Sequence, residues 1–185
     1  MKADPEKIKP LIRQLILEMG EDPEREGLRD TPERVAKSFA ELYAGYCQKP
    51  EDVITVFENE GYDEMVIARD IDFYSMCEHH MLPFFGKAHV GYIPGKKIVG
   101  LSKMPRLVEV FARRLQNQER MTKQIADSLN AMLAPKGVGV VIESSHLCLQ
   151  ARGAQKKDCV MSTSSFTGLF KTDQRTRSEF LELIR

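Results

Sequence analysis

Four consecutive positions near the middle of the chain carry a thiol, a carboxylate and two imidazoles: Cys77, Glu78, His79 and His80. Side chains of these types bind zinc and transfer protons near neutral pH. A thiolate and an imidazole three residues apart can turn toward one metal ion from a single tight turn, so Cys77 and His80 could supply half of a zinc site. The same spacing also arises by coincidence, as a buried thiol beside a surface histidine.

A second stretch is expected to complete this site. Residues 138–149 are rich in β-branched side chains and predict a strand, on which residues two apart face the same side. His146 and Cys148 would then face the same way. The sequence therefore predicts three zinc ligands, Cys77, His80 and Cys148, with water in the fourth position. This is the arrangement of a catalytic zinc, because structural zinc normally has four protein ligands.

The remaining histidines and cysteines receive different interpretations. His79 and His146 would lie unligated beside the water, where they are candidates for general acid and base catalysis. His89 falls inside another predicted strand and is interpreted as a structural or surface residue. Cys47 and Cys159 are interpreted as unpaired thiols without function, because so few, scattered cysteines do not predict a disulfide scaffold.

Basic residues open one of the predicted helices. Ser102 is a suitable N-cap for a helix that continues through Phe111, and Lys103 and Arg106 fall in its first turn. Cations there oppose the helix dipole, and a bound anion would resolve the conflict. A solvated basic turn is the alternative. Arg152, four residues beyond Cys148, could reach the zinc cleft as a second anion-binding group.

Another predicted helix, residues 119–133, begins next to two polar side chains. Gln118 and Glu119 place a hydrogen-bond acceptor and a carboxylate at the helix start. They could contact a ligand or cap the helix.

Composition excludes some broad classes of function. Lys and Arg total 27 of the 185 residues, as do Asp and Glu, so no general attraction to nucleic acid or a membrane surface is predicted. The first residues, 1–5, contain no apolar leader, and no later apolar run reaches membrane-spanning length. We therefore expect a soluble protein of the cytoplasm.

The periodicity of apolar residues predicts an α+β protein in two parts. Residues 1–62 form an N-terminal segment with two helices. The first covers 8–20, so Pro10 has to lie in its first turn or begin it. The second begins at Thr31 and buries Tyr46, and residues 51–62 form a connection. Residues 63–185 form the catalytic domain. Strands are predicted over 65–76, 87–93, 138–149 and 159–167, and the chain returns from the second of them through 98–101. Helices are predicted over 102–111 and 119–133, and a C-terminal helix over 173–184. The ββααββ order predicts one antiparallel sheet with helices on one face. Pairing of its two free edges between subunits would close an oligomeric barrel.

Several short motifs recur in the order found in one enzyme family. They are Cys77-Glu78-His79-His80, Gly86-Lys87, Tyr92-Ile93-Pro94, Gly100-Leu101-Ser102-Lys103, Gln118-Glu119-Arg120, His146-Leu147-Cys148, Ala151-Arg152-Gly153 and Gly168-Leu169-Phe170. Over about residues 30–185 the chain closely resembles zinc-dependent GTP cyclohydrolase I. The resemblance implies a tunnelling fold, a toroidal homodecamer and active sites at subunit boundaries. It also implies the family reaction, in which GTP is opened by hydrolysis at C8, loses formate, and is rearranged and reclosed to 7,8-dihydroneopterin triphosphate.

The resemblance also implies a role for each candidate residue. The zinc ligands are again Cys77, His80 and Cys148. His146 resembles the proton donor at N7 of guanine, and His79 resembles a second acid–base group near C8 and the ribose oxygen. The residues that resemble substrate contacts are Glu119 for guanine N1 and the 2-amino group, Gln118 for holding the base, and Lys103, Arg106 and Arg152 for the triphosphate. Ser102 is similar to a serine that assists the ribose rearrangement. No regulatory protein partner can be inferred.

Two other classes of function fit part of the sequence. A binding module would hold a purine or pterin nucleotide without converting it, but it gives no reason for two spare histidines beside a metal. A structural metal site would need a fourth protein ligand, for which Cys159 or His79 would have to serve.

Overall fold

The computed structural model describes residues 3–185. Met1 and Lys2, on which the expectation of no apolar leader partly rested, lie outside the described residues. The helices are α1 (Pro5–Glu18), α2 (Thr31–Leu42), the 3₁₀ helix η1 (Ala44–Cys47), α3 (Pro50–Val53), α4 (Lys103–Ala112), α5 (Gln118–Leu133), α6 (Leu147–Gln150), α7 (Leu169–Thr172) and α8 (Gln174–Leu183). The strands are β1 (Val56–Glu58), β2 (Val66–Cys77), β3 (Pro83–Ile93), β4 (Lys97–Val99), β5 (Leu115–Gln116), β6 (Gly137–His146) and β7 (Met161–Phe166).

One five-stranded sheet, in the order β5-β2-β3-β6-β7, forms the centre of the α+β fold. The four long strands pair antiparallel in the predicted ββααββ sequence, β2-β3-α4-α5-β6-β7. The short strand β5 adds a parallel partner to the end of β2, where Cys77 pairs with Gln116. Because β5 directly precedes α5, this pairing brings the end of β2 to the start of that helix.

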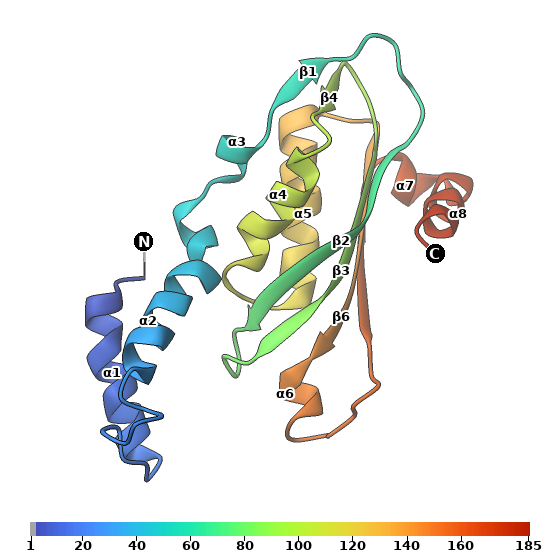
Figure 1. The fold of residues 1–185 in the computed structure, drawn as a ribbon. Helices are drawn as coiled ribbons and strands as arrows, with labels where there is room; N and C mark the ends of the chain where they lie inside the picture. The colour runs from blue at the N-terminus through green and yellow to red at the C-terminus, as the bar shows by residue number, and fades with distance from the viewer. Residues whose placement is uncertain (1–2) are drawn as a thin grey trace.

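The two faces of the sheet are covered by different helices (Figure 1). Alternation along β6 divides its side chains between them: Val140 and Ile142 belong to the core cluster under α4 and α5, whereas Val141 belongs to a second cluster with Phe170 and Phe180 of α7 and α8. The prediction of helices on one face was therefore incomplete. The C-terminal helices lie on the opposite face because that side of β6 is also apolar.

The N-terminal helices α1 and α2 pack on each other and extend away from the sheet (Figure 1). Asp4 caps α1 by accepting a hydrogen bond from the backbone N–H of Glu6, so the helix begins at Pro5. Pro10 therefore lies inside the helix, and its predicted place in the first turn was wrong. The predicted burial of Tyr46 was also wrong, because its side chain is 46% exposed.

The stretch predicted as a connection, residues 51–62, contains regular structure. It includes part of α3 and the strand β1, which pairs antiparallel with β4 from the catalytic half of the chain. Together they form a separate two-stranded sheet. Among residues 3–185, no helix is both long enough and apolar enough to cross a membrane.

Gly86 of β3 lies where two strands approach closely, next to the segment that carries His146. A Cβ atom there would lie 1.9 Å from the carbonyl oxygen of Glu143 and 2.7 Å from Cα of Ser144. We expect Gly86→Ala to reduce the free energy of unfolding by about 1–3 kcal/mol or more, because backbone cannot move aside as a side chain can. Thermal unfolding measures this. Gly27→Ala is the matched control, since its Cβ would meet only the Arg25 side chain, and an equal loss in both variants would contradict the prediction.

Candidate functional site

Cys77 ends β2, and a tight turn returns the chain to β3. The backbone N–H of Cys77 donates to the carbonyl oxygen of Leu82, and that of Met81 donates to the carbonyl oxygen of Cys77, both at 2.8 Å. This turn places Cys77 Sγ 3.7 Å from Nδ1 of His80. The predicted local pair is therefore formed, and Nδ1 is the imidazole nitrogen that faces the thiol.

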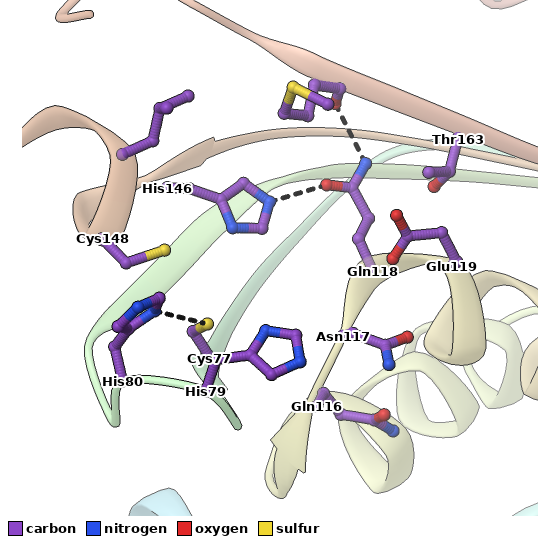
Figure 2. Close-up of a pocket in the computed structure, with 12 residues that line it drawn as sticks. Cys77, His79, His80, Gln116, Asn117, Gln118, Glu119, His146, Cys148 and Thr163 are labelled. Carbon is purple, nitrogen blue, oxygen red and sulfur yellow. Dashed lines mark hydrogen bonds between the residues drawn. The ribbon is translucent and has the colours of Figure 1, made fainter. Parts of the chain in front are cut away.

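Cys148 reaches the same place, although the strand predicted over 138–149 was wrong at its end. β6 stops at His146, and Cys148 lies in the short helix α6. The ligand atoms of Cys77, His80 and Cys148 all lie within 4.8 Å of one another. The turn of α6, rather than strand alternation, brings the Cys148 thiol to the other two side chains (Figure 2).

These three residues form the only group of three or more potential metal-binding His, Cys, Asp or Glu side chains among residues 3–185. Neither His79 nor Cys159 belongs to it. A tetrahedral zinc with bonds of about 2.3 Å to sulfur and 2.0–2.1 Å to nitrogen separates two such ligands by about 3.6 Å. The spacing of Cys77 and His80 fits that geometry. Thiolate and imidazole are also the ligand types that zinc prefers.

A cleft of about 280 Å³ adjoins this cluster, between the end of the sheet and the start of α5 (Figure 2). Its lining residues are Cys77, His79, His80, Gln116, Asn117, Gln118, Glu119, His146, Cys148, Leu149, Met161 and Thr163. Seven of the residues predicted to act in the site therefore line one cleft: Cys77, His79, His80, Gln118, Glu119, His146 and Cys148.

His146 is held rigidly at the edge of the cleft. Its ring stacks on Phe84 with the centroids 4.6 Å apart and the planes at 1°. Its Nε2 lies 2.8 Å from Oε1 of Gln118. Burial lowers the pKa of His146, and the negative charge of Glu119 opposes that shift. An imidazole that is neutral near pH 7 and fixed in orientation can exchange a proton with a bound molecule.

Glu119 and His79 are both exposed in the cleft. The cap of α5 is Asn117, whose side chain accepts from the backbone N–H of Arg120, so neither Gln118 nor Glu119 has the capping role. The carboxylate of Glu119 lies in the first turn, where the helix dipole favours negative charge. It is therefore available to a ligand.

Sequence reasoning gave no role to Arg120, which connects the two halves of the site. Its guanidinium pairs with Glu78, in the turn between Cys77 and His80, and donates to Oε1 of Gln116. Asn117 also donates to Glu78, at 2.9 Å. The Arg120 hydrogen bond is the main cause that lowers the pKa of Glu78. These contacts fix the turn over residues 77–80 against the start of α5, and the only sequence signal for them was the Gln118-Glu119-Arg120 motif.

The predicted anion-binding residues lie in two different places. Ser102, Lys103 and Arg106 are at the start of α4, beside β4 and at the far end of the molecule from the cleft (Figure 1). Ser102 is the N-cap residue of α4, as predicted, but its side chain makes no capping hydrogen bond. Arg152 lies near enough to the cluster for its charge to act on Cys148. Burial and the neighbouring Cys77 raise the pKa of Cys148, and the positive charge of Arg152 opposes that rise.

Known proteins resemble this chain over almost its whole length. A family model described as GTP cyclohydrolase I matches residues 8–185. A GTP cyclohydrolase 1 from Chlorobaculum tepidum is 62% identical over 94% of this chain and 78% of its own, and one from Wolinella succinogenes is 58% identical over 94% of each chain. One from Deinococcus radiodurans is 53% identical over 98% of this chain and 85% of its own.

Proposed function

Because the chain belongs to the GTP cyclohydrolase I family, we propose that it hydrolyses GTP at C8 of guanine, releases formate, rearranges the ribose and recloses the ring to 7,8-dihydroneopterin triphosphate. The observation that carries the proposal is the convergence of Cys77, His80 and Cys148 beside the fixed imidazole of His146. A three-ligand metal site next to an acid–base group is suited to hydrolysis.

Zinc is the metal that this donor set fits. Cys77, His80 through Nδ1, and Cys148 would hold it and leave one position open toward the cleft. When bound there, zinc supplies a lowered pKa for water, which makes hydroxide accessible near pH 7. This matters because C8 of guanine is a weak electrophile.

The two other histidines of the cleft have acid–base roles in the proposal. His146 supplies the proton that N7 takes up as the attacking water adds to C8. His79, which is exposed in the cleft, serves near C8 and the ribose oxygen during the later steps. Ser102, which directly precedes Lys103 at the start of α4, is proposed to assist the ribose rearrangement in the cleft of a neighbouring subunit.

Guanine is selected by the carboxylate of Glu119. It can accept hydrogen bonds from N1–H and the 2-amino group together, a pair of donors that adenine lacks. Gln118 was expected to help hold the base, but its side chain has a different set of partners, described below.

The triphosphate requires residues that one chain does not bring to the cleft. Lys103 begins α4 and Ala112 ends it near the cleft, and ten helical residues span about 15 Å. Lys103 and Arg106 therefore serve the cleft of a neighbouring subunit, together with Arg152 of the subunit that holds the metal. This supports the expected closed barrel and homodecamer with active sites at subunit boundaries.

The proposal keeps residues 1–62 as an N-terminal segment and 63–185 as the catalytic domain, located in the cytoplasm. The apolar side chains exposed by α1 and its C-cap residue, Leu11, Leu15 and Met19, would then pack on another subunit. No nucleic acid or membrane takes part.

The direct test is conversion of GTP by the assembled, zinc-loaded protein, followed by oxidation and detection of pterin fluorescence. We expect fluorescence that disappears when a chelator removes the metal and returns when zinc is restored, since the hydroxide depends on it. ATP is the matched control and should give no product. Recovery of unchanged GTP from a metal-replete oligomer would contradict the proposal and indicate a binding protein.

A further inference from the structure

Gln118 has an unusually complete set of hydrogen bonds for a side chain in a cleft. Its Nε2 donates to the backbone carbonyl oxygens of Ile142 and Met161, at 2.9 and 3.0 Å. Its Oε1 lies 2.7 Å from the hydroxyl of Ser144 and 2.8 Å from Nε2 of His146. The residue is only 3% exposed. Both donors and both acceptor positions of the amide are therefore used by the protein, and none remains for a base.

The two backbone carbonyls determine the orientation of this amide. A carbonyl oxygen can only accept, so the atom of Gln118 that faces Ile142 and Met161 has to be the NH₂ group. Oε1 is then the atom that faces His146, and it can only accept as well. The hydroxyl oxygen of Ser144 also lies 3.1 Å from Nε2 of His146, but its hydrogen is donated to Oε1 of Gln118, so it too can only accept from the ring. Consequently Nε2 of His146 has to carry a hydrogen, and in the neutral ring Nδ1 carries the lone pair.

The position of the ring directs the lone pair of Nδ1 toward the cluster of Cys77, His80 and Cys148. Phe84 covers one face of the imidazole, which limits its rotation. Figure 2 shows His146 between Gln118 and the cluster of Cys77, His80 and Cys148, with the nitrogen that is not bonded to Gln118 on the side of the cluster. With its hydrogen on Nε2, the ring presents the lone pair of Nδ1 to the cleft, so it can accept a proton there before it donates one.

We propose that Gln118 is a positioning residue that fixes the proton of His146 on Nε2, so that Nδ1 carries one proton from the attacking water to N7. The inference rests on the proposed function and deepens it. As the water oxygen bonds to C8, its O–H bond breaks and Nδ1 takes the proton. The electron pair of the N7–C8 double bond moves to N7, which then takes the proton from Nδ1. Water is thereby added across N7 and C8, and His146 returns to its starting state.

Nitrogen NMR of the sedimented, zinc-loaded oligomer tests the tautomer without any turnover. Protein labelled with ¹⁵N in histidine is compared with His146→Gln, which identifies the His146 signals. We expect a neutral ring protonated at Nε2, and a mixture of tautomers in Gln118→Met, which keeps the length of the side chain but removes its amide. A His146 ring protonated at Nδ1 in the wild-type protein would overturn the proposal. This result is independent of whether GTP is converted, so failure of the proposed function is seen separately.

Kinetics then distinguish positioning from contact with the base. For Gln118→Met we expect kcat to fall about 10²-fold with bound zinc retained and KM changed less than about threefold. In a His146→Gln background the same change should cause no further loss, because Gln118 acts through His146. Gln14→Met makes the same change on the exposed surface of α1 and should leave kcat unaltered. A raised KM with kcat preserved, or an equal loss in both backgrounds, would show instead that Gln118 contacts the substrate.

Discussion

Cys148→Ser should lose the metal and turnover together. Serine is nearly the same size, but its hydroxyl is not ionised near pH 7 and is a poor ligand for zinc beside one thiolate and one imidazole. Changes to residues that only support metal ligands cost about 10–100-fold in affinity, so loss of a ligand should cost at least on the order of 10²-fold. Conversion of GTP should fall below about 0.1% of the wild-type rate, because hydroxide is then scarce at neutral pH.

The measurement is zinc content after dialysis, taken beside the pterin assay on the same sample. Cys159→Ser is the matched control, since that thiol is also partly buried and free but lies outside the metal-binding group. We expect it to keep both zinc and activity. One zinc per chain in Cys148→Ser would refute the ligand assignment, and loss of zinc with turnover intact would refute the role of the metal.

The sequence correctly predicted that Cys77, His80 and Cys148 come together, but it predicted the local structure around Cys148 incorrectly. The β-branched run ends at Ile142, and the polar residues that follow can continue a strand or leave it. The chain leaves it after His146, where α6 begins. The ligand set did not depend on that detail, because either geometry brings Cys148 near the end of β2. What fixed the prediction was the combination of residue types in two separate stretches.

Other features could not be predicted because they depend on residues that are distant in the sequence. The carbonyl groups that bind Gln118 lie 24 and 43 residues away from it, and Glu78 lies 42 residues from Arg120. A motif shows that Gln118 and Glu119 are adjacent, but not that one side chain is buried in the protein while the other is exposed to the cleft. Neighbours in sequence thereby take different roles.

The basic start of α4 shows a third kind of limit. Lys103 and Arg106 have the residue types of an anion site, but sequence gives no measure of their distance from Cys77. One subunit places them at the opposite end of the sheet (Figure 1). Pairing of the sheet edges between subunits could bring Lys103 and Arg106 to the cleft of a second subunit. The sequence of one chain does not specify how subunits are arranged around each other.

His146→Ala should keep the metal and lose ring opening. The residue is not in the metal-binding group, so zinc content should remain at about one per chain. Without the imidazole, no group is placed to move a proton between water and N7, and such groups contribute about 10²–10⁴-fold to a rate. We therefore expect kcat to fall by that factor, while GTP binding, which we assign to Glu119 and the basic residues, stays within a few fold.

A structural effect of His146→Ala has to be separated from the chemical one. The change also removes the ring that stacks on Phe84 and bonds to Gln118, so some stability will be lost. His89→Gln is the control for this, because His89 is 3% exposed and its Nδ1 accepts from the backbone N–H of Asp70, yet it does not line the cleft. It should lower the unfolding temperature and leave kcat per folded protein unchanged. If His146→Ala retains more than about a tenth of the wild-type kcat, proton transfer through this imidazole is not part of the rate-limiting chemistry, and the exposed His79 becomes the group to which that transfer has to be assigned.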